Sequence, residues 1–131
     1  MPGKSQSHTD AVLNVLRGTD LTGVAPYVGL FSMAPADDSS AGTELAGNGY
    51  ARQAITFGAP ATDVGNVRKI ANTNNIQFGP ALANWPEAVA FGVFASLAGT
   101  LLYWDTLPTP KTVEQDDYGQ FAVGTLVVKE D

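Results

Sequence analysis

Residues 88–104, AVAFGVFASLAGTLLYW, decide the fold class. Along residues 88–96, a set of apolar residues alternates with a set made of Phe94 and small residues, so the two sets point to opposite faces. The first face carries Val89, Phe91, Val93 and Ala95. A period of two predicts a half-buried β-strand. Leu97, Ala98 and Gly99 separate it from the apolar run 100–104, so the stretch predicts a tight antiparallel hairpin.

Short apolar runs between turn signals recur on both sides of this hairpin. Further strands are expected at residues 27–33 (YVGLFSM), 50–57, 112–114 and 120–128, with a weaker pair at 67–71 and 75–78 around the turn 72–74. Loops rich in Gly, Ser, Asp and Pro are expected at 34–49 and 58–66. About eight short strands with turns every ~8–12 residues predict a mainly β chain, an antiparallel β-sandwich of jelly-roll-like or related topology.

One short helix is expected near the N-terminus. Thr9 or Asp10 can cap a helix that runs through Arg17, and Gly18 can end it. Residues 1–8 are polar and predict a flexible arm, or one that a neighbour orders. The expected organisation is therefore an arm at 1–8 and a single β-sandwich domain at 9–131.

Charge and composition exclude several classes of function. The net charge of -6 argues against nucleic-acid binding, and Arg68-Lys69 is the one adjacent basic pair. The absence of cysteine rules out disulfides and thiolate metal sites. Only 15% of residues are charged, against ~25% in typical soluble domains, so a partner is expected to cover part of the surface.

The sequence predicts neither a membrane span nor a secretory signal. No apolar run approaches the ~18 residues that a spanning helix needs. The first ten residues, MPGKSQSHTD, lack an apolar signal region. We therefore expect a soluble protein that is made in the cytoplasm.

Residue patterns for catalysis or metal binding are weak. His8 is the one histidine and lies in the polar arm, and no GxSxG motif is present. Asp37-Asp38 could join Asp63, Asp105 or Asp116-Asp117 around a hard cation, but acidic pairs in turns more often bond the turn itself. The sequence therefore predicts no enzyme, no cofactor and no metal.

Aromatic residues offer a second kind of site. Sugars stack on exposed aromatic rings, and the candidates for such stacking or for an interface are Tyr50, Trp85, Tyr103 and Trp104, with Tyr118 as a further ring. Trp85 follows a loop before a strand, and Trp104 ends an apolar strand. These positions favour core or interface packing over a sugar platform.

The order of the motifs resembles a known group of proteins. The helix ends in LRGT, and YVGLFS, GTEL.G.GYARQAITFGAP, FGVFAS..GTLLYWDTL and FAVGTLVV follow. Over residues 10–128 the chain is similar to small structural proteins of tailed-phage virions, often labelled tail-fibre-like. The resemblance implies a non-enzymatic virion protein with no catalytic residues.

Three hypotheses about function remain open. The chain lacks the long repeats or heptads of a fibre shaft, which favours a capsid decoration or cement protein that binds and stabilises the major capsid protein lattice. The alternative is a tail-tip or tail-fibre-associated module that contacts host surface glycan, and the third hypothesis is an enzyme such as a wall or glycan hydrolase. Copies that meet at a symmetry axis predict a homo-oligomer, a trimer or dimer.

Overall fold

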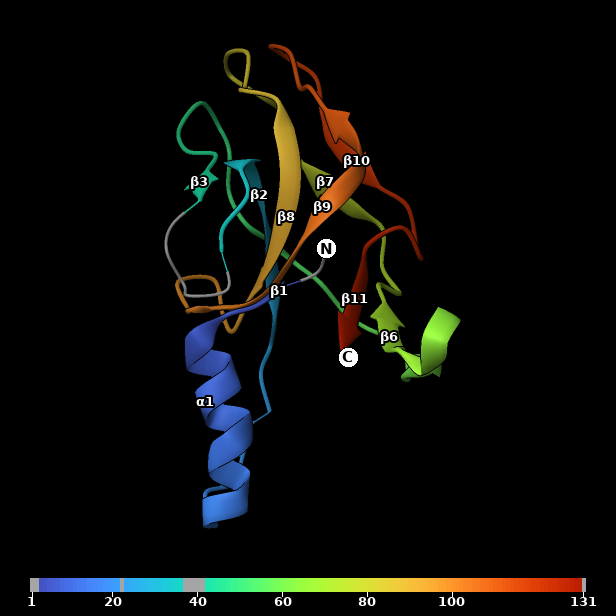
Figure 1. Ribbon diagram of the computed structural model, residues 1–131. Helices are drawn as coiled ribbons and strands as arrows, with labels where there is room; N and C mark the ends of the chain where they lie inside the picture. Colours follow the sequence, from blue (N-terminus) through green and yellow to red (C-terminus); the bar gives the residue numbers. More distant parts are fainter. Residues whose placement is uncertain (1–2, 22, 37–41, 131) are drawn as a thin grey trace.

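The computed structural model describes residues 3–21, 23–36 and 42–130 (Figure 1). The helical segments are α1 (Gln6–Asn14), η1 (Val15–Arg17) and η2 (Val64–Asn66). The strands are β1 (Gly3–Lys4), β2 (Tyr27–Met33), β3 (Thr43–Glu44), β4 (Gln53–Ala54), β5 (Ala61–Thr62), β6 (Arg68–Ala71), β7 (Ile76–Phe78), β8 (Ala88–Phe94), β9 (Leu101–Lys111), β10 (Gly119–Phe121) and β11 (Val127–Glu130). The mainly β fold class with one helix near the N-terminus is confirmed.

The longest pairings join β2, β8 and β9, and all are antiparallel. Leu30 of β2 lies opposite Phe91 of β8, and Gly92 of β8 lies opposite Trp104 of β9. The sheet has the order β1-β9-β8-β2-β3, and β4 pairs with a separate part of β2. The predicted hairpin of β8 and β9 is confirmed.

Two small sheets pack on one face of this large sheet. One pairs β7 with β10, and the other joins β5, β6 and β11. The core between the layers takes Val28, Leu30, Phe91 and Val93 from the large sheet and Ile76, Phe78, Phe121 and Val128 from the small ones. Phe91 and Val93, which the alternation placed on one face of β8, thus lie in the core of a two-layer sandwich.

A second cluster fills the opposite face of the large sheet. Phe31 and Phe94 stack there with ring centroids 6.1 Å apart, and Ala90 lies beside them. Val89 packs against this cluster, although the alternation predicted it on the face of Phe91. Both faces of β8 are therefore apolar.

The β8–β9 ladder is irregular beside Val89. Ala90 lies opposite Thr106, but Ala88 lies opposite Lys111, so β9 residues 107–110 face a single residue of β8. Pro108 and Pro110 fall in this interval and have no N–H to donate to a ladder. The strict period of two fails where the register shifts.

The helix begins earlier than the sequence predicted. The side-chain oxygen of Ser5 accepts the backbone N–H of His8 at 3.2 Å, so Ser5, and not Thr9 or Asp10, is the N-cap. Gly18 ends η1 with φ 90° in the left-handed region, as predicted.

The first described residues, which begin at Gly3, pair with the large sheet. β1 pairs antiparallel with β9, with Gly3 opposite Trp104 and Lys4 opposite Tyr103. Of the segment predicted as a flexible arm, residues 3–8 thus form β1, the buried Ser5 and the first turn of α1. Residues 1–2 lie outside the described ranges.

Several of the other predicted strands are shorter or paired differently. The strand predicted at 50–57 is reduced to β4, the run 120–128 divides into β10 and β11, and 112–114 contains no strand. β6 and β7 pair with β11 and β10 and not with each other. Asn72, between them, is buried and accepts the N–H of Leu126 at 3.0 Å, which ties that turn to the C-terminal segment.

Candidate functional site

The four aromatic candidates fall into two separate places. Tyr50 and Trp85 contact each other with ring centroids 5.7 Å apart, whereas Tyr103 and Trp104 are neighbours on β9. Successive residues of a strand point to opposite faces, so Tyr103 and Trp104 do not share a surface. The structure therefore brings Tyr50 and Trp85 into contact but places Tyr103 and Trp104 on different surfaces.

Trp85 and the ring of Tyr50 belong to the core. Trp85 is only 4% exposed, and its indole N–H donates to the carbonyl of Asn48 at 2.8 Å. The Tyr50 ring stacks on Phe78 with centroids 6.0 Å apart. The buried Trp85 offers no free face on which a sugar could stack, and Phe78 covers one face of the Tyr50 ring.

The Tyr50 hydroxyl joins a polar cluster with Glu44 and Arg52. The hydroxyl donates to Glu44 Oε2 at 2.7 Å and accepts the backbone N–H of Leu30 at 3.0 Å. Burial, together with the hydrogen bond to Glu44, raises the pKa of Tyr50 far above its ordinary value of 10.0. The hydroxyl thus stays neutral. It accepts the N–H of Leu30, which lies between the β2 residues that pair with β4 and those that pair with β3.

Arg52 connects this cluster to the β8–β9 hairpin. Its Nη1 donates to the carbonyl of Leu97 at 3.0 Å, and its guanidinium carbon lies 3.4 Å from the centroid of the Phe94 ring. The hydrogen bond with Glu44 raises the pKa of Arg52 against the opposing effect of burial. Sequence reasoning missed Glu44 and Arg52 as a pair, although both lie in the quoted GTEL.G.GYARQ motif.

Tyr103 lies in a different polar cluster, which joins the two ends of the described chain. Its hydroxyl donates to Glu130, and Lys4 forms an ion pair with the same carboxylate. His8 packs edge-on against the Tyr103 ring, with centroids 5.0 Å apart. Burial, with the hydrogen bond to Glu130, raises the pKa of Tyr103 well above 10.0.

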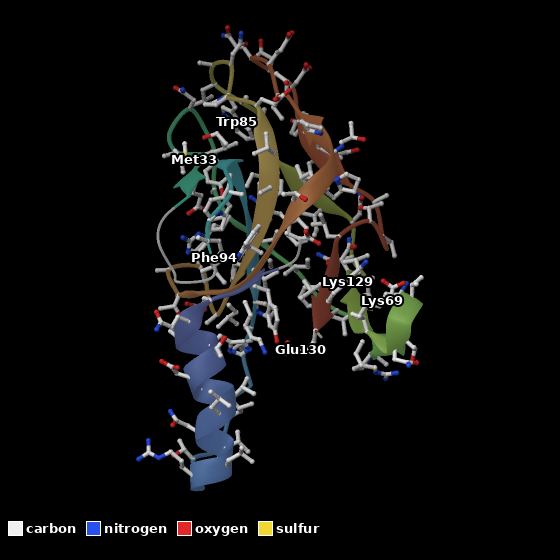
Figure 2. All side chains as sticks on the ribbon, in the orientation of Figure 1. Met33, Lys69, Trp85, Phe94, Lys129 and Glu130 are labelled. Atoms are coloured by element: carbon white, nitrogen blue, oxygen red, sulfur yellow. The ribbon has the colours of Figure 1, made fainter. Side chains whose placement is uncertain are left out.

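Tyr103 also lines a groove between β9 and the sheet of β6 and β11. The groove has a volume of about 450 Å³, and its lining is Pro60, Arg68, Lys69, Ile70, Tyr103, Val128, Lys129 and Glu130. We refer to this set as the Tyr103 groove. Lys69, Lys129 and Glu130 lie at the end of the sandwich nearer α1, whereas Trp85 lies toward the other end (Figure 2).

Asp63 forms ion pairs with both lysines of the Tyr103 groove. It lies 2.8 Å from Lys129 Nζ and 3.6 Å from Lys69 Nζ, measured to its carboxylate oxygens. The hydrogen bond from Lys129, followed by one from the backbone N–H of Val64, lowers the pKa of Asp63 to about 2. Asp63 therefore acts as an ion-pair partner.

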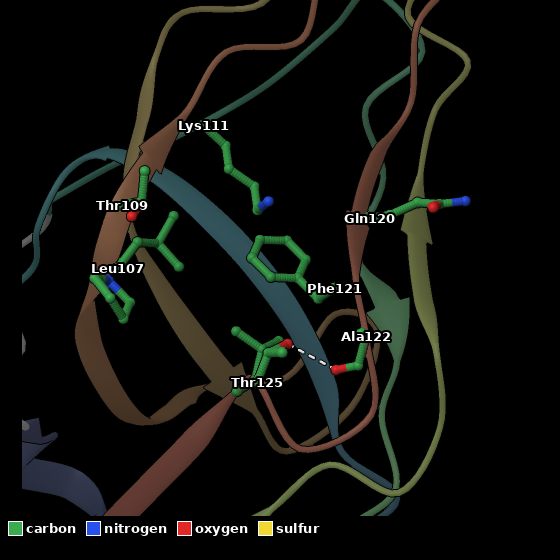
Figure 3. Close-up of a pocket in the computed structure, with 9 residues that line it drawn as sticks. Leu107, Thr109, Lys111, Gln120, Phe121, Ala122 and Thr125 are labelled. Carbon is green, nitrogen blue, oxygen red and sulfur yellow. Dashed lines mark hydrogen bonds between the residues drawn. The ribbon is translucent and has the colours of Figure 1, made fainter.

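A second hollow, of about 340 Å³, lies between β9 and β10 (Figure 3). Lys111 reaches over the ring of Phe121, with Nζ 5.0 Å from the centroid. Thr125 Oγ1 donates to the carbonyl of Ala122 at 2.7 Å. Because Phe121 is only 4% exposed, this hollow offers little aromatic surface for stacking.

The remaining acidic candidates do not converge. Among residues 3–21, 23–36 and 42–130, no three His, Asp or Glu side chains gather where they could hold a metal ion. Asp37 and Asp38 lie outside the described residues. In the part of the chain that the structure describes, no helix is long and apolar enough to cross a membrane.

Comparison with known proteins places the chain in a family. No curated protein matches it. A family model described as "Podophage GP4 fiber I protein gp80" matches residues 3–129, nearly the whole chain. The chain belongs to this Gp80 family of phage fibre-type structural proteins, which are components of the virion.

Proposed function

We propose that this chain is a non-enzymatic, tail-fibre-associated module that contacts host surface glycan through the Tyr103 groove. The fibre description of the family supports a tail role over capsid decoration. Capsid decoration remains a prediction that neither the family description nor the geometry supports. The structural character of the family supports the absence of catalysis.

The position of Tyr103 carries the glycan part of the proposal. Of the four aromatic candidates, Tyr103 lines the described groove, whereas Trp85 is buried in the core. Glycan sites combine an aromatic or apolar surface with a few placed polar groups. The volume of about 450 Å³ lies within the usual range for ligand sites.

The rest of the lining suits a saccharide. Pro60 and Ile70 supply apolar groups beside the ring of Tyr103. The exposed Arg68 already donates to Thr62 Oγ1 at 2.7 Å and to the carbonyl of Pro60 at 3.2 Å. Its guanidinium has five N–H donors, so others remain for sugar hydroxyls or acidic substituents.

Binding of the purified full chain to immobilised bacterial surface glycans tests the proposal. Tyr103→Phe keeps the ring and should keep binding, whereas Tyr103→Leu and Arg68→Ala should each weaken it about tenfold or more. Tyr118→Ala, at a half-exposed ring outside the groove, is the matched control. A Tyr103→Leu protein that is folded and binds glycan normally would refute the proposal that glycan binds in the Tyr103 groove.

Quantitative mass spectrometry of virions tests the location. A fibre-associated protein is expected in few copies per particle. A copy number close to that of the major capsid protein would instead support decoration and contradict our proposal.

A further inference from the structure

The Tyr103 groove gathers basic residues in a chain that is acidic overall. Arg68, Lys69 and Lys129 all belong to its lining, beside Glu130. The whole chain has seven Lys and Arg residues against thirteen Asp and Glu residues. Three of those seven basic residues thus share one groove. The pairing of β6 with β11 brings Lys129 to the Arg68-Lys69 pair from a distant part of the chain.

The two lysines of the groove lie directly opposite each other in the β6–β11 ladder. Like charges in that position repel and destabilise a pair of strands. Asp63 offsets the repulsion, since its carboxylate oxygens lie 3.6 Å from Lys69 Nζ and 2.8 Å from Lys129 Nζ. Each ammonium has three N–H donors, and both side chains remain more than a third exposed. The two lysines can therefore donate to a second anionic group while they keep Asp63.

The groove stays positive after its acidic neighbours are counted. Lys4 pairs with Glu130. The hydrogen bond to Asp63, followed by the charges of Asp63 and Asp105, raises the pKa of Lys129. The lining and these neighbours together hold four basic and three acidic residues, a net charge of +1 that leaves -7 for the rest of the chain. They are Lys4, Arg68, Lys69, Lys129, Asp63, Asp105 and Glu130.

We propose that the ligand of the Tyr103 groove is an acidic saccharide whose carboxylate binds to Lys69, Lys129 and Arg68. The inference rests on the proposed glycan contact and names the class of sugar that makes it. An acidic polymer and a chain with a net charge of -6 repel each other on average. The polymer therefore approaches best where the local charge is positive, and a groove concentrates that attraction.

A sugar carboxylate suits this groove better than a phosphate monoester. The groove has a surplus of one positive charge, which a single carboxylate balances. A phosphate monoester carries close to two negative charges at neutral pH and would leave one of them unbalanced beside Asp63 and Glu130. Arg68 adds a planar guanidinium, whose paired N–H groups match the two oxygens of a carboxylate. The uncharged part of the sugar can then contact the ring of Tyr103.

Binding of the full chain to bacterial surface polysaccharides, each before and after reduction of its carboxyl groups to alcohols, tests the proposal. The reduction removes the negative charge and keeps the sugar backbone. At about 50 mM salt the acidic form should bind about tenfold or more tightly than the reduced form. The difference should shrink at about 500 mM salt, because salt screens charges that are exposed to solvent.

Substitutions of the lysines separate charge from fold. Lys69→Gln and Lys129→Gln should each reduce the preference for the acidic form several-fold, whereas Lys69→Arg keeps the charge and should keep the preference. The matched control is Lys111→Gln, which removes the same charge beside Phe121, outside the groove, and should also keep it. The unfolding temperature of each variant is measured in parallel, because Lys129 also bonds Asp63. An equal loss in Lys111→Gln would overturn the proposal.

Small competitors distinguish the two kinds of anion. Glucuronate should displace the acidic polymer at a lower concentration than glucose or glucose 6-phosphate. Stronger displacement by glucose 6-phosphate would overturn the choice of a carboxylate.

The failure of this proposal can be told from the failure of the proposed function. Equal binding of the acidic and reduced polymers would overturn the acidic ligand and leave the glycan contact standing, and Tyr103→Leu should then still weaken binding of both forms. Binding of neither form would refute both proposals.

Discussion

Arg52 and Glu44 form an ion pair through two hydrogen bonds, Nη2 to Oε1 at 2.8 Å and Nε to Oε2 at 3.0 Å. Both side chains are about four-fifths shielded from solvent. The pair joins the short strand β3 to the residues before β4, and Arg52 also bonds the carbonyls of the β8–β9 turn. A few side-chain bonds thus replace the backbone ladder that such short strands lack.

Arg52→Lys should destabilise the fold by about 1–3 kcal/mol. Lysine keeps the charge but cannot bond both Glu44 oxygens and the turn carbonyls together. Urea denaturation measures the change, with Arg17→Lys on the exposed helix as control, expected within ~0.5 kcal/mol. Equal shifts in the two variants would show that the two-bond geometry contributes nothing.

Tyr50→Phe should cost about 1–3 kcal/mol, although it removes a single oxygen. The Leu30 N–H would lose its acceptor in the gap between β3 and β4. The stacking on Phe78 is retained, so the effect isolates the hydroxyl. Tyr118→Phe, at a half-exposed ring, is the control and should leave the free energy of unfolding nearly unchanged.

Trp85→Phe should lower stability and leave glycan binding intact. The variant loses the donor to the Asn48 carbonyl and leaves a small cavity, at a cost of about 1–3 kcal/mol. Thermal unfolding and glycan binding are measured on the same preparation. A folded variant that has lost glycan binding would place the glycan contact at Trp85 and not at Tyr103.

Stability should fall as the pH drops below about 6.5, the ordinary pKa of histidine. Partial burial, followed by the positive charge of Lys4, lowers the pKa of His8 in the folded state, against the opposing effect of Glu130. The unfolded chain therefore binds a proton more readily, and the His8 contribution is full above ~6.5 and declines below it. Between pH 8 and pH 5.5, unfolding temperatures of the wild type should fall more than those of His8→Gln.

Local patterns predicted the regular parts of the fold. The range 27–33 is β2 residue for residue, and the β8–β9 hairpin forms where the alternation placed it. Gly18 ends the helical segment as expected, because a left-handed residue is recognisable as glycine in the sequence. The start of the helix was missed because Ser5 and Thr9 are equally plausible caps until the pairing of β1 with β9 is known.

The candidate site was predicted only in part. Aromatic content drew attention to Tyr50, Trp85, Tyr103 and Trp104, but residue type does not show which rings are buried. The lining of the Tyr103 groove comes from Pro60, residues 68–70, Tyr103 and residues 128–130, which the sandwich brings together from three parts of the chain. Asp37 and Asp38 lie outside the described residues.

The sequence by itself determined the strands that alternate, the helix stop at Gly18, the absence of cysteine chemistry and the resemblance to phage virion proteins. These properties depend on neighbouring residues or on residue type alone. The tertiary structure decided which strands pair, the bonds of Glu44, Tyr50 and Arg52, and the position of Tyr103 in a groove. Those depend on contacts between residues that are far apart in the sequence, such as Lys4 and Glu130. A local residue pattern does not predict such contacts.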